Sequence, residues 1–275
     1  MIYRFFLIIC LSVISQSIAA QNVGQKGDTL INYTDINNMK QGVWRKVYPN
    51  GKLAYEGKFR NVKPIGVFNR YFEDGDLKAT LIYDENGETA NATLYHKNQI
   101  IAAEGKYFDK EKHKVWNYYS KKEQLIMTES YDKGLKHGKF VKYLANGKIA
   151  EESNWIQSQQ NGMWRLFFES GRKKMETKYM NGKRSGLYYV YYDNGQLMVK
   201  GKYLNDKRNG DWTFYERNGD TKITIEYIDG KASNSEELDK LIKKEFEEYE
   251  KNKKRFKDPA HYKNDIEEYI RNTQY

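Results

Sequence analysis

The sequence contains very few of the residues from which reactive sites are usually built. It has one cysteine, Cys10, and only four histidines among 275 residues. If the first twenty residues are removed on export, no thiol remains, which excludes disulfides, thiolate nucleophiles and cysteine–zinc sites. The histidines lie at no ligand spacing, and no Gly-x-Ser-x-Gly, His-Glu-x-x-His or phosphate-binding glycine loop is present. We therefore expect no enzymatic activity, no cofactor and no metal site.

Long hydrophobic runs are also missing, except at the N-terminus. Residues 1–20 combine a short positive region at Arg4 with an apolar stretch and a small-residue end. This pattern is typical of a cleaved signal peptide, and the apolar stretch is shorter than the about 20 residues that cross a bilayer. Ile9 precedes Cys10 where a bacterial lipoprotein signal has a small residue. We predict an exported, soluble protein that is periplasmic, surface-bound or secreted.

Aromatic and basic residues, by contrast, are abundant. The chain is 15% aromatic, 39% hydrophobic and 31% charged, which indicates a globular protein. Its net charge is +10; removing Arg4 leaves +9, and residues 233–275 hold ten Lys or Arg against eleven Asp or Glu, so residues 21–232 carry +10. A basic, aromatic surface suits anionic lipid headgroups, envelope glycans or nucleic acid. We exclude nucleic acid, since an exported protein rarely meets it, and the lysines could equally serve only solubility.

A tripeptide of the form Gly-x-aromatic recurs with a period of 24 residues. It begins at Gly42, Gly66, Gly138, Gly162, Gly186 and Gly210. The one gap of 72 residues equals three periods, and within it Lys114-Val115-Trp116 keeps the aromatic residue while Ala90-Asn91-Ala92 has lost it. A fixed period of this length is typical of repeat arrays. The sequence therefore predicts eight 24-residue units.

Each unit also carries a turn pair and a second aromatic residue in the same phase. The pairs are Asn50-Gly51, Asp74-Gly75, Asn98-Gln99, Lys122-Glu123, Asn146-Gly147, Ser170-Gly171, Asn194-Gly195 and Asn218-Gly219. Because Asn-Gly tolerates positive φ at both positions, we predict a type I′ hairpin turn at these pairs. A second turn, such as Asn181-Gly182, would lead into the next hairpin. The later aromatic column is Phe59, Tyr83, Tyr107, Tyr131, Trp155, Tyr179, Tyr203 and Tyr227.

The fold expected is all-β, an open antiparallel array of hairpins followed by an α-helical segment. Sixteen strands at about 4.8 Å each would form a rod of about 80 Å. One hairpin alone is marginally stable, so rings of successive units must pack on each other. We expect one stacking ladder at Trp44, Phe68, Trp116, Phe140, Trp164, Tyr188 and Trp212, and a second at Tyr71, Tyr95, Tyr119, Tyr143, Phe167, Tyr191 and Tyr215. Both columns are candidates for a structural role or for ligand binding.

The two ends differ from the repeats. We divide the chain into a signal peptide (1–20), an N-terminal cap (21–41), the repeat domain (42–232) and a helical tail (233–275). Ser233 and Glu236 form a capping box that predicts a helix from about residue 234 to 254. Its apolar stripe is Leu238, Leu241, Ile242, Phe246 and Tyr249. The stripe would either cover the last hairpin or dock a second protein.

The units resemble the variant MORN repeat of bacterial proteins labelled YwqK-type antitoxins. The resemblance rests on segments such as GVWRKVYPNGKLAYEGKF (42–59) and GLYYVYYDNGQLMVKGKY (186–203), and extends from about Gly42 to Lys231. It departs at Ala92, Gln99, Lys122 and Glu123, which replace signature residues. The resemblance implies a ladder of β-hairpins with an interaction role and no catalysis.

These observations together favour an exported, non-enzymatic repeat scaffold that binds another protein. An envelope-binding module that holds glycan or anionic lipid through tyrosines and lysines is the main alternative. A neutralising, antitoxin-like protein is a third, although an exported protein would be separated from a cytoplasmic toxin. The identity of the partner, the face that binds it, the curvature of the rod and the oligomeric state are left open by the sequence.

Overall fold

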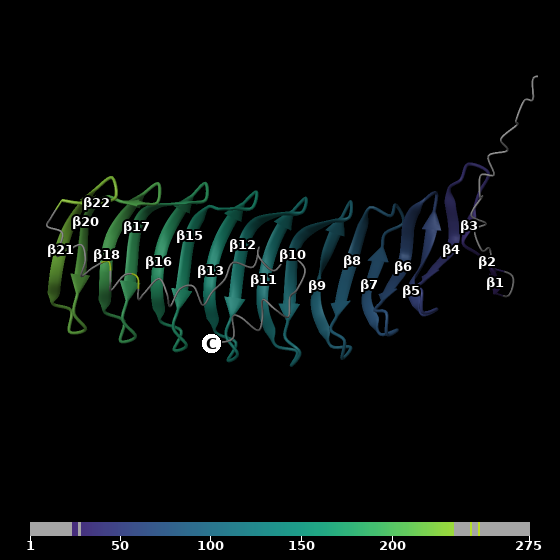
Figure 1. Cartoon of the computed structure of the whole chain (residues 1–275), viewed down its shortest axis with the longest axis horizontal. Helices are drawn as coiled ribbons and strands as arrows, with labels where there is room; N and C mark the ends of the chain where they lie inside the picture. The colour runs from purple at the N-terminus through teal and green to yellow at the C-terminus, as the bar shows by residue number, and fades with distance from the viewer. Residues whose placement is uncertain (1–23, 27–28, 234–242, 244–246, 248–275) are drawn as a thin grey trace, which may run out of the picture.

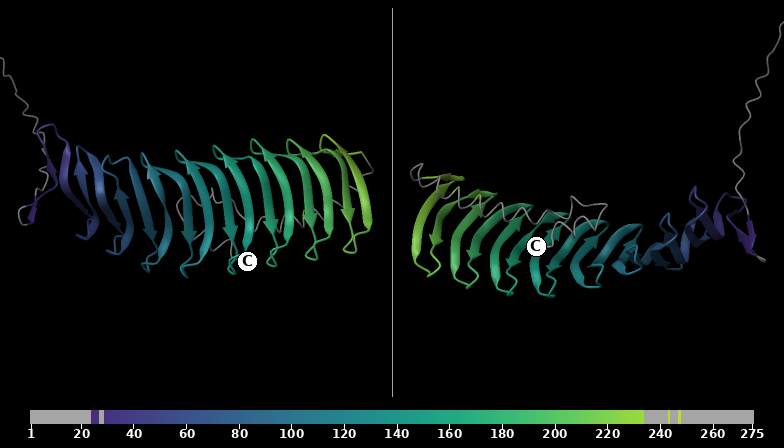
Figure 2. Two further views of the ribbon diagram at one scale, coloured as in Figure 1. Left: turned by 180° about the vertical axis from the view of Figure 1, so that it is seen from behind. Right: turned by 60° about the horizontal axis from the view of Figure 1, so that its bottom comes forward.

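The strands of the protein lie side by side in one long sheet. The computed structural model describes residues 24–26, 29–233, 243 and 247. In Figures 1 and 2 the strands form a single layer that runs the length of the described chain. The predicted all-β, open hairpin array is confirmed. The predicted C-terminal helix lies outside the described residues, apart from Lys243 and Glu247, and no helix of the described part is long and apolar enough to span a bilayer.

Each repeat unit contributes one hairpin to the sheet. The first four units are β4 (Lys40–Val47) with β5 (Leu53–Arg60), β6 (Lys63–Tyr71) with β7 (Leu77–Tyr83), β8 (Thr89–Tyr95) with β9 (Ile101–Phe108), and β10 (Glu111–Tyr119) with β11 (Leu125–Asp132). The last four are β12 (Leu135–Tyr143) with β13 (Ile149–Ile156), β14 (Gln159–Gln160) and β15 (Gly162–Phe167) with β16 (Lys173–Met180), β17 (Lys183–Tyr191) with β18 (Leu197–Leu204), and β19 (Lys207–Arg208) and β20 (Gly210–Tyr215) with β21 (Thr221–Ile228). Since β14 with β15 and β19 with β20 each form one interrupted strand, sixteen antiparallel strands result, as the period predicts.

The turn inside each unit, here called the opening turn, differs from the prediction. In unit one the amide of Gly51 donates to the carbonyl of Tyr48 at 2.9 Å, and only Gly51 has positive φ, +82°. This is a four-residue turn followed by a left-handed residue, so the prediction of type I′ at Asn50-Gly51 was wrong. Asn50 serves a different purpose: its Nδ2 donates to the carbonyl of Glu73 in the next opening turn at 2.9 Å. The asparagine therefore links neighbouring units.

The two-residue geometry occurs instead at the turn between units, here called the closing turn. Asn181 and Gly182 have φ of +50° and +78°, and Asn205 and Asp206 have +51° and +68°. Positive φ at both positions is the requirement of a type I′ turn, whose twist matches that of the paired strands. The closing turn of unit two is longer, and there Asp84 accepts the amide hydrogens of its own loop. Thus both turns of the unit were found from the sequence, but their types were exchanged.

The leading position of the repeat, which is glycine in six units, marks a β-bulge. Gly57 pairs with Phe68 and Lys58 pairs with Ile65, so two residues of β6 between these pairs have no partner on β5. The residue at this column is left-handed in seven units; it is Gly42, Gly66, Lys114, Gly138, Gly162, Gly186 and Gly210. In unit three the column holds Ala90, whose φ is not positive, and β7 and β8 pair without a register shift. The loss of the motif there therefore removes the bulge itself.

The rings of the leading column pack over small residues of the strand before them. A Cβ added to Gly201 would lie 2.3 Å from the ring of Trp212, and one added to Gly57 would lie 2.0 Å from Phe68. Such contacts leave no room for a side chain. Where the small residue is replaced by Leu81, its directly paired neighbour in the next unit is Ala92 in place of an aromatic residue. The ring and the space for it thus change together.

The rings meet in an alternating series that combines two aromatic columns. Trp212 contacts Tyr203 and Tyr227 edge to face, with ring centroids 5.0 Å and 6.1 Å apart, and Tyr188 contacts Tyr203 at 5.3 Å. Direct contact between consecutive members of the leading column also occurs, at 5.3 Å between Tyr188 and Trp212. Edge-to-face and offset pairs are the favourable arrangements of aromatic rings.

The predicted second ladder was wrong. Tyr191 contacts Tyr189 of its own strand at 6.3 Å, and its hydroxyl donates to Glu176 at 3.2 Å. Tyr119 donates in the same way to Glu104 at 3.1 Å. Members of one column are two strands apart, about 9.6 Å, which is too far for ring contact unless the side chains lean together. These tyrosines bind carboxylates on the opposite face of the sheet from the leading rings.

Short strands extend the sheet at both ends. At the N-terminal end β1 (Gly24–Lys26) pairs with β2 (Thr29–Ile31), β2 pairs with β4 in parallel, and β3 (Tyr33–Thr34) pairs with β4 in antiparallel. At the other end β22 (Lys231–Ala232) pairs with β21. Additional strands of this kind occupy backbone groups that would otherwise be free at a sheet edge.

We predict that the contact between a ring and a small residue can be rebuilt as the pair found at Leu81 and Ala92. Gly201→Leu should lower the free energy of unfolding by about 3 kcal/mol through overpacking, and Trp212→Ala by about 4 kcal/mol through loss of buried area. If the two losses were additive, the double variant would lose about 7 kcal/mol. We expect its free energy of unfolding to be at least about 2 kcal/mol higher than that additive value, because the leucine fills the space left by the ring. Urea unfolding measures all three.

The control is Lys202→Leu, an exposed change on the same strand and the opposite face, which should cost less than about 0.5 kcal/mol. If the losses in free energy of unfolding of the two single variants simply add in the double variant, the side chains at 201 and 212 do not fill the same space, and the prediction is wrong.

Candidate functional site

The sheet has two faces of different chemistry. Strand pairing places two continuous rows on one of them, called the ring face. The ring row is Trp44, Gly57, Phe68, Leu81, Ala92, Gly105, Trp116, Glu129, Phe140, Ser153, Trp164, Thr177, Tyr188, Gly201, Trp212 and Ile225. The inner row is Lys46, Tyr55, Arg70, Ala79, Leu94, Ala103, Tyr118, Met127, Lys142, Glu151, Leu166, Met175, Val190, Val199, Phe214 and Ile223. The opposite side is called the polar face.

The seven candidate residues of the leading column all lie in the ring row and are all buried. Trp116 and Trp212 are 0% exposed, and Trp44 and Trp164, at 8%, are the most exposed of the seven. Their indole nitrogens have partners, since Trp116 Nε1 donates to the carbonyl of Lys106 at 3.0 Å and Trp164 Nε1 to Glu151 Oε1 at 2.7 Å. Rings buried to this degree form the core of the sheet and present almost no surface to a ligand.

Cationic side chains lie over the rings next to the closing turns. The guanidinium carbon of Arg184 is 4.1 Å from the ring centroid of Tyr203, and that of Arg208 is 4.8 Å from Tyr227. Lys112 Nζ lies 4.9 Å from the ring centroid of Trp116. Each cation is attracted to the negative face of the ring below it. Part of the positive charge of the repeats is therefore used in packing.

A buried polar cluster interrupts the ring row in unit four. Glu129, 4% exposed, stands at a column that is uncharged in every other unit, and its Oε1 is 2.8 Å from Lys136 Nζ, close enough for an ion pair but not aligned as a hydrogen bond. Tyr131 donates its hydroxyl hydrogen to Glu129, and Lys112 Nζ donates to the hydroxyl of Tyr118 at 2.8 Å. Tyr118 and Tyr131 belong to the apolar core cluster of the first half of the sheet, so the charged groups are embedded in that cluster.

Burial controls the protonation of this cluster. Removal from water raises the pKa of Tyr118 and Tyr131, and the nearby carboxylate of Glu129 raises both further. The same loss of water lowers the pKa of Lys112. The tyrosines therefore remain neutral hydrogen-bond donors throughout the physiological range. Since Tyr118 is 2% exposed and part of the apolar core cluster, this arrangement belongs to the packing of the core and is closed to a ligand.

Lys142 is a second buried cation, in the inner row of unit five. It is 7% exposed, and burial lowers its pKa to about 8, although Glu151 directly opposite on β13 acts against this shift. It lies between Met127 and Glu151 on the two neighbouring strands, and keeping it protonated in this buried position costs free energy. The sequence offered no signal for this, because the lysine occupies a column that is polar in some units and apolar in others.

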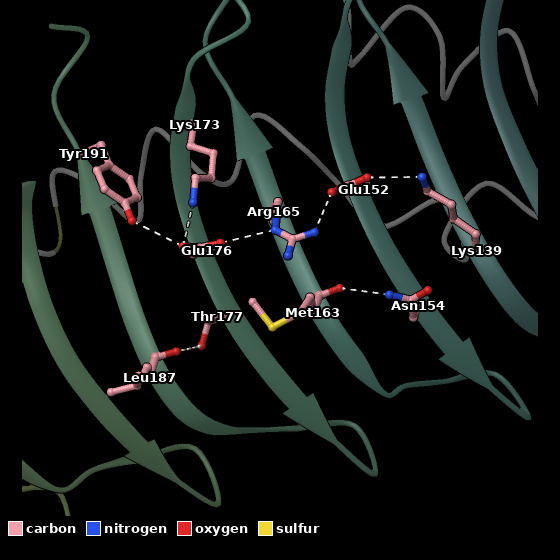
Figure 3. Close-up of polar contacts among 10 residues, drawn as sticks. All are labelled: Lys139, Glu152, Asn154, Met163, Arg165, Lys173, Glu176, Thr177, Leu187 and Tyr191. Atoms are coloured by element: carbon pink, nitrogen blue, oxygen red, sulfur yellow. Dashed lines mark hydrogen bonds and ion pairs between the residues drawn. The ribbon is translucent and has the colours of Figure 1, made fainter. Parts of the chain in front are cut away.

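The polar face carries a cross-strand network of charges (Figure 3). Arg165 on β15 contacts Glu152 on β13 at 2.7 Å and Glu176 on β16 at 3.2 Å, while Lys139 contacts Glu152 at 3.3 Å and Lys173 contacts Glu176 at 2.8 Å. Burial alone would raise the pKa of both glutamates, but their bonds to these cations hold it below the ordinary value. The carboxylates are therefore ionised and paired near neutral pH.

Exposed apolar side chains follow one edge of the polar face. They occupy the last strand position before the closing turn; they are Phe108, Ile156, Met180, Leu204 and Ile228, and we call them the edge stripe. Their exposed fractions run from 41% to 63%, which is high for large apolar groups. Lysines lie two residues earlier in three of these strands, at Lys106, Lys178 and Lys202. The signal was present in the sequence, as an apolar residue recurring every 24 positions, but the more regular aromatic columns concealed it.

The remaining candidates fall elsewhere. The docking helix residues Leu238, Leu241, Ile242, Phe246 and Tyr249 lie outside the described residues. Ser233, predicted to begin that helix, donates through Oγ to the carbonyl of Glu226 at 3.2 Å. Within the described ranges no group of three or more His, Cys, Asp or Glu side chains is placed to hold a metal ion.

Three segments of the chain match the MORN repeat variant, at residues 40–61, 136–157 and 184–205. Each matched segment begins near the start of a strand that holds a bulge, continues through the opening turn and ends in the closing turn, so one match corresponds to one hairpin of the structure. No curated protein sequence matches the chain. The units at these three places therefore match the MORN repeat variant, and the narrower resemblance to YwqK-type proteins stays a prediction.

Similar solved structures agree only weakly in shape. S. aureus TarM matches at a TM-score of 0.27 with 12% identity over 34% of this chain and 19% of its own. A GtfA/B complex bound to UDP and GlcNAc matches at 0.17 with 13% identity over 66% and 28%, and a Photorhabdus luminescens Tc holotoxin pore at 0.17 with 11% identity over 72% and 13%. This chain thus spans less than a third of each of these proteins.

We predict that Lys142→Met stabilises the protein near neutral pH. With the pKa of Lys142 at about 8 in the folded protein and 10.5 as its ordinary value, the unfolded chain binds more protons between these pH values. The free energy of unfolding of the wild type therefore rises relative to that of the variant as the pH increases from 8 to 10. The variant should be more stable at pH 7, by up to about 3 kcal/mol, and this advantage should shrink above pH 8. Urea unfolding at pH 7, 8, 9 and 10 measures the difference.

Lys139→Met, which removes an exposed lysine from the polar face, is the matched control. Its difference in stability from the wild type should stay constant from pH 7 to pH 10. A constant difference between Lys142→Met and wild type over this range would mean that Lys142 is not buried as a cation.

Proposed function

We propose that this protein is an exported, non-enzymatic repeat scaffold that binds a protein partner along the edge stripe. The observation that carries the proposal is the recurrence of exposed apolar side chains in phase with the repeat. Ile156, Met180, Leu204 and Ile228 are 47% to 63% exposed and stand in consecutive units. At two strands per unit, neighbouring members are about 9.6 Å apart. A stripe of this length suits an extended partner better than a small molecule.

The chemistry around the stripe indicates what kind of segment would bind. Protein interfaces bury apolar anchors within a polar rim, and exposed apolar groups gathered in a row commonly mark such interfaces. Lys178 and Lys202 flank the stripe in units six and seven and are exposed. The partner expected is therefore a protein segment with apolar residues and adjacent carboxylates.

One specific observation favours the alternative of envelope binding. The same lysines, with Lys58 and Lys106 in units one and three, form a basic line along the polar face. Anionic lipid headgroups or acidic glycans would be attracted to such a line, and this attraction would weaken steeply with salt. A protein partner that also buries the apolar stripe would be less sensitive to salt, so the two functions are separable.

Export is the first part of the proposal to test. Chain produced in its native cell should begin at Gln21, because the signal peptide ends at Ala20, and should be found outside the cytoplasm. N-terminal sequencing of the purified protein, with cell fractionation, measures both. Chain that retains Met1 and stays in the cytoplasm would contradict export, and would make a cytoplasmic neutralising role the better explanation.

Partner binding is tested with a matched pair of variants. Met180→Glu with Leu204→Glu adds two negative charges to the edge stripe, whereas Gln124→Glu with Gln196→Glu adds the same charge at exposed opening turns on the other edge. Proteins that co-purify from the native envelope should be at least tenfold depleted with the first variant and unchanged with the second. Quantitative mass spectrometry measures the depletion, and equal recovery with both variants would reject the edge stripe.

A third variant, with Lys178 and Lys202 changed to Gln, tests the alternative. Sedimentation with vesicles that contain anionic lipid, or with purified cell-wall glycan, should show no binding by the wild-type protein above that of a neutral control at low or moderate salt. Binding at low salt that weakens steeply as salt is raised, and that is lost in the Lys178 and Lys202 variant, would replace the protein partner with an envelope surface.

A further inference from the structure

The inner row of the ring face changes character along the molecule. In its first half it includes charged members, such as Lys46 and Arg70, and in the middle it holds Lys142 opposite Glu151. In units six to eight every member is apolar: Leu166, Met175, Val190, Val199, Phe214 and Ile223. Six directly paired apolar residues, next to a ring row, make a continuous apolar surface across six strands.

This surface is buried although the sheet is a single layer. Met175 is 1% exposed, Val190 2%, Val199 4%, and Leu166 and Phe214 5% each. Neighbouring strands cover such side chains only from the sides, so their outer ends would remain in water on an open sheet face. The described residues supply no second layer over this face, because each strand pairs only with its sheet neighbours (Figures 1 and 2). Lys46 and Arg70, at the other end of the same row, are exposed, whereas Tyr118 and Met127 of unit four are buried like the members of units six to eight. This contrast along one row points to a covering segment over the later units.

We propose that residues 234–275 of the same chain cover the ring face of units six to eight. The segment starts beside unit eight, because Ser233 is held against the last full strand, β21. Its amide and its Oγ both donate hydrogen bonds to the carbonyl of Glu226. Forty-two residues follow, and their apolar positions Leu238, Leu241 and Ile242 recur at the three- and four-residue spacing of a helix face.

Length and charge both fit this placement. The apolar part of the inner row spans six strands, about 24 Å, and a helix of twenty residues would be about 30 Å long. Cations lie along the same face beside the closing turns, at Arg184 and Arg208. The segment contains eleven Asp or Glu against ten Lys or Arg, but its first charged residues, Glu236, Glu237 and Asp239, are all acidic. Acidic side chains on the covering segment would face these cations across an apolar contact.

The consequence for function is a face that the protein keeps closed to other molecules. An apolar row of this size, if uncovered, would attract a second copy or a foreign segment. A partner that uses the ring face would first have to displace residues 234–275, and that displacement would reduce its apparent affinity. The proposal does not depend on the edge stripe, which lies on the opposite face.

Cysteine labelling in the full chain tests the placement. In a Cys10→Ser background, Val199→Cys lies on the ring face and its neighbour Lys200→Cys on the polar face of the same strand. Maleimide should modify Val199→Cys at least tenfold more slowly than Lys200→Cys. Adding Leu238→Asp and Ile242→Asp should raise the rate at Val199→Cys at least tenfold and leave Lys200→Cys unchanged, with folding checked by circular dichroism.

Disulfide trapping gives a second measurement that needs no disruption of the segment. Val199→Cys combined with a cysteine at Leu238, Leu241 or Ile242 should form an intramolecular disulfide in at least one pair under mild oxidation. The same three positions combined with Lys200→Cys should form none. Non-reducing electrophoresis distinguishes bonds within one chain from bonds between two.

Each outcome decides the proposal. Slow labelling that the Asp variants relieve, or an intramolecular disulfide on the ring face only, supports it. Slow labelling that becomes fast on dilution, or disulfides between chains, would assign the cover to a second copy and overturn it. Labelling of Val199→Cys as fast as that of Lys200→Cys would overturn it as well, because the face would then be open.

Discussion

The contact between an aromatic ring and a small residue on the strand before it is the interaction on which the sheet depends. It requires a glycine-like position such as Gly201, a left-handed bulge residue such as Gly186 ahead of each ring, and an edge-to-face partner such as Tyr203. These three requirements explain why the motif and the later aromatic column keep one phase. Because each ring contacts groups from adjacent strands, no hairpin completes its own core.

The sequence alone predicted the number of strands, the positions of both turns and the packing of the leading column of rings, but not that these rings alternate with small residues and with the later aromatic column. It could not assign the turn types, because Asn-Gly is compatible with type I′ and also with a four-residue turn that ends in a left-handed glycine. Closing turns such as Gln157-Ser158 carry no strong turn residues, yet both have positive φ. There the pairing of the flanking strands, and not local preference, selects the geometry.

The candidate site was less accessible to sequence reasoning. Which aromatic column faces the core depends on the register of each strand, and a bulge changes that register by a number of residues that the motif does not reveal. The sequence could not identify Glu129 and Lys142 as buried charges, because lysine and glutamate side chains are usually exposed to solvent. The edge stripe, at positions such as Met180 and Leu204, could have been found by comparing all 24 columns with equal care.

The length of the repeat has a consequence for how such a chain can change. A unit of twenty-four residues contains two complete strands with their turns and bulge, so adding or removing a whole unit leaves every later side chain on its original face and brings neighbours of the same kind together at the junction. An insertion of one residue inside a strand would instead move the later side chains of that strand to the opposite face, so that a lysine would occupy the buried position of a tryptophan. The sheet can therefore be lengthened or shortened by whole units, whereas insertions of one or a few residues are tolerated only at the turns.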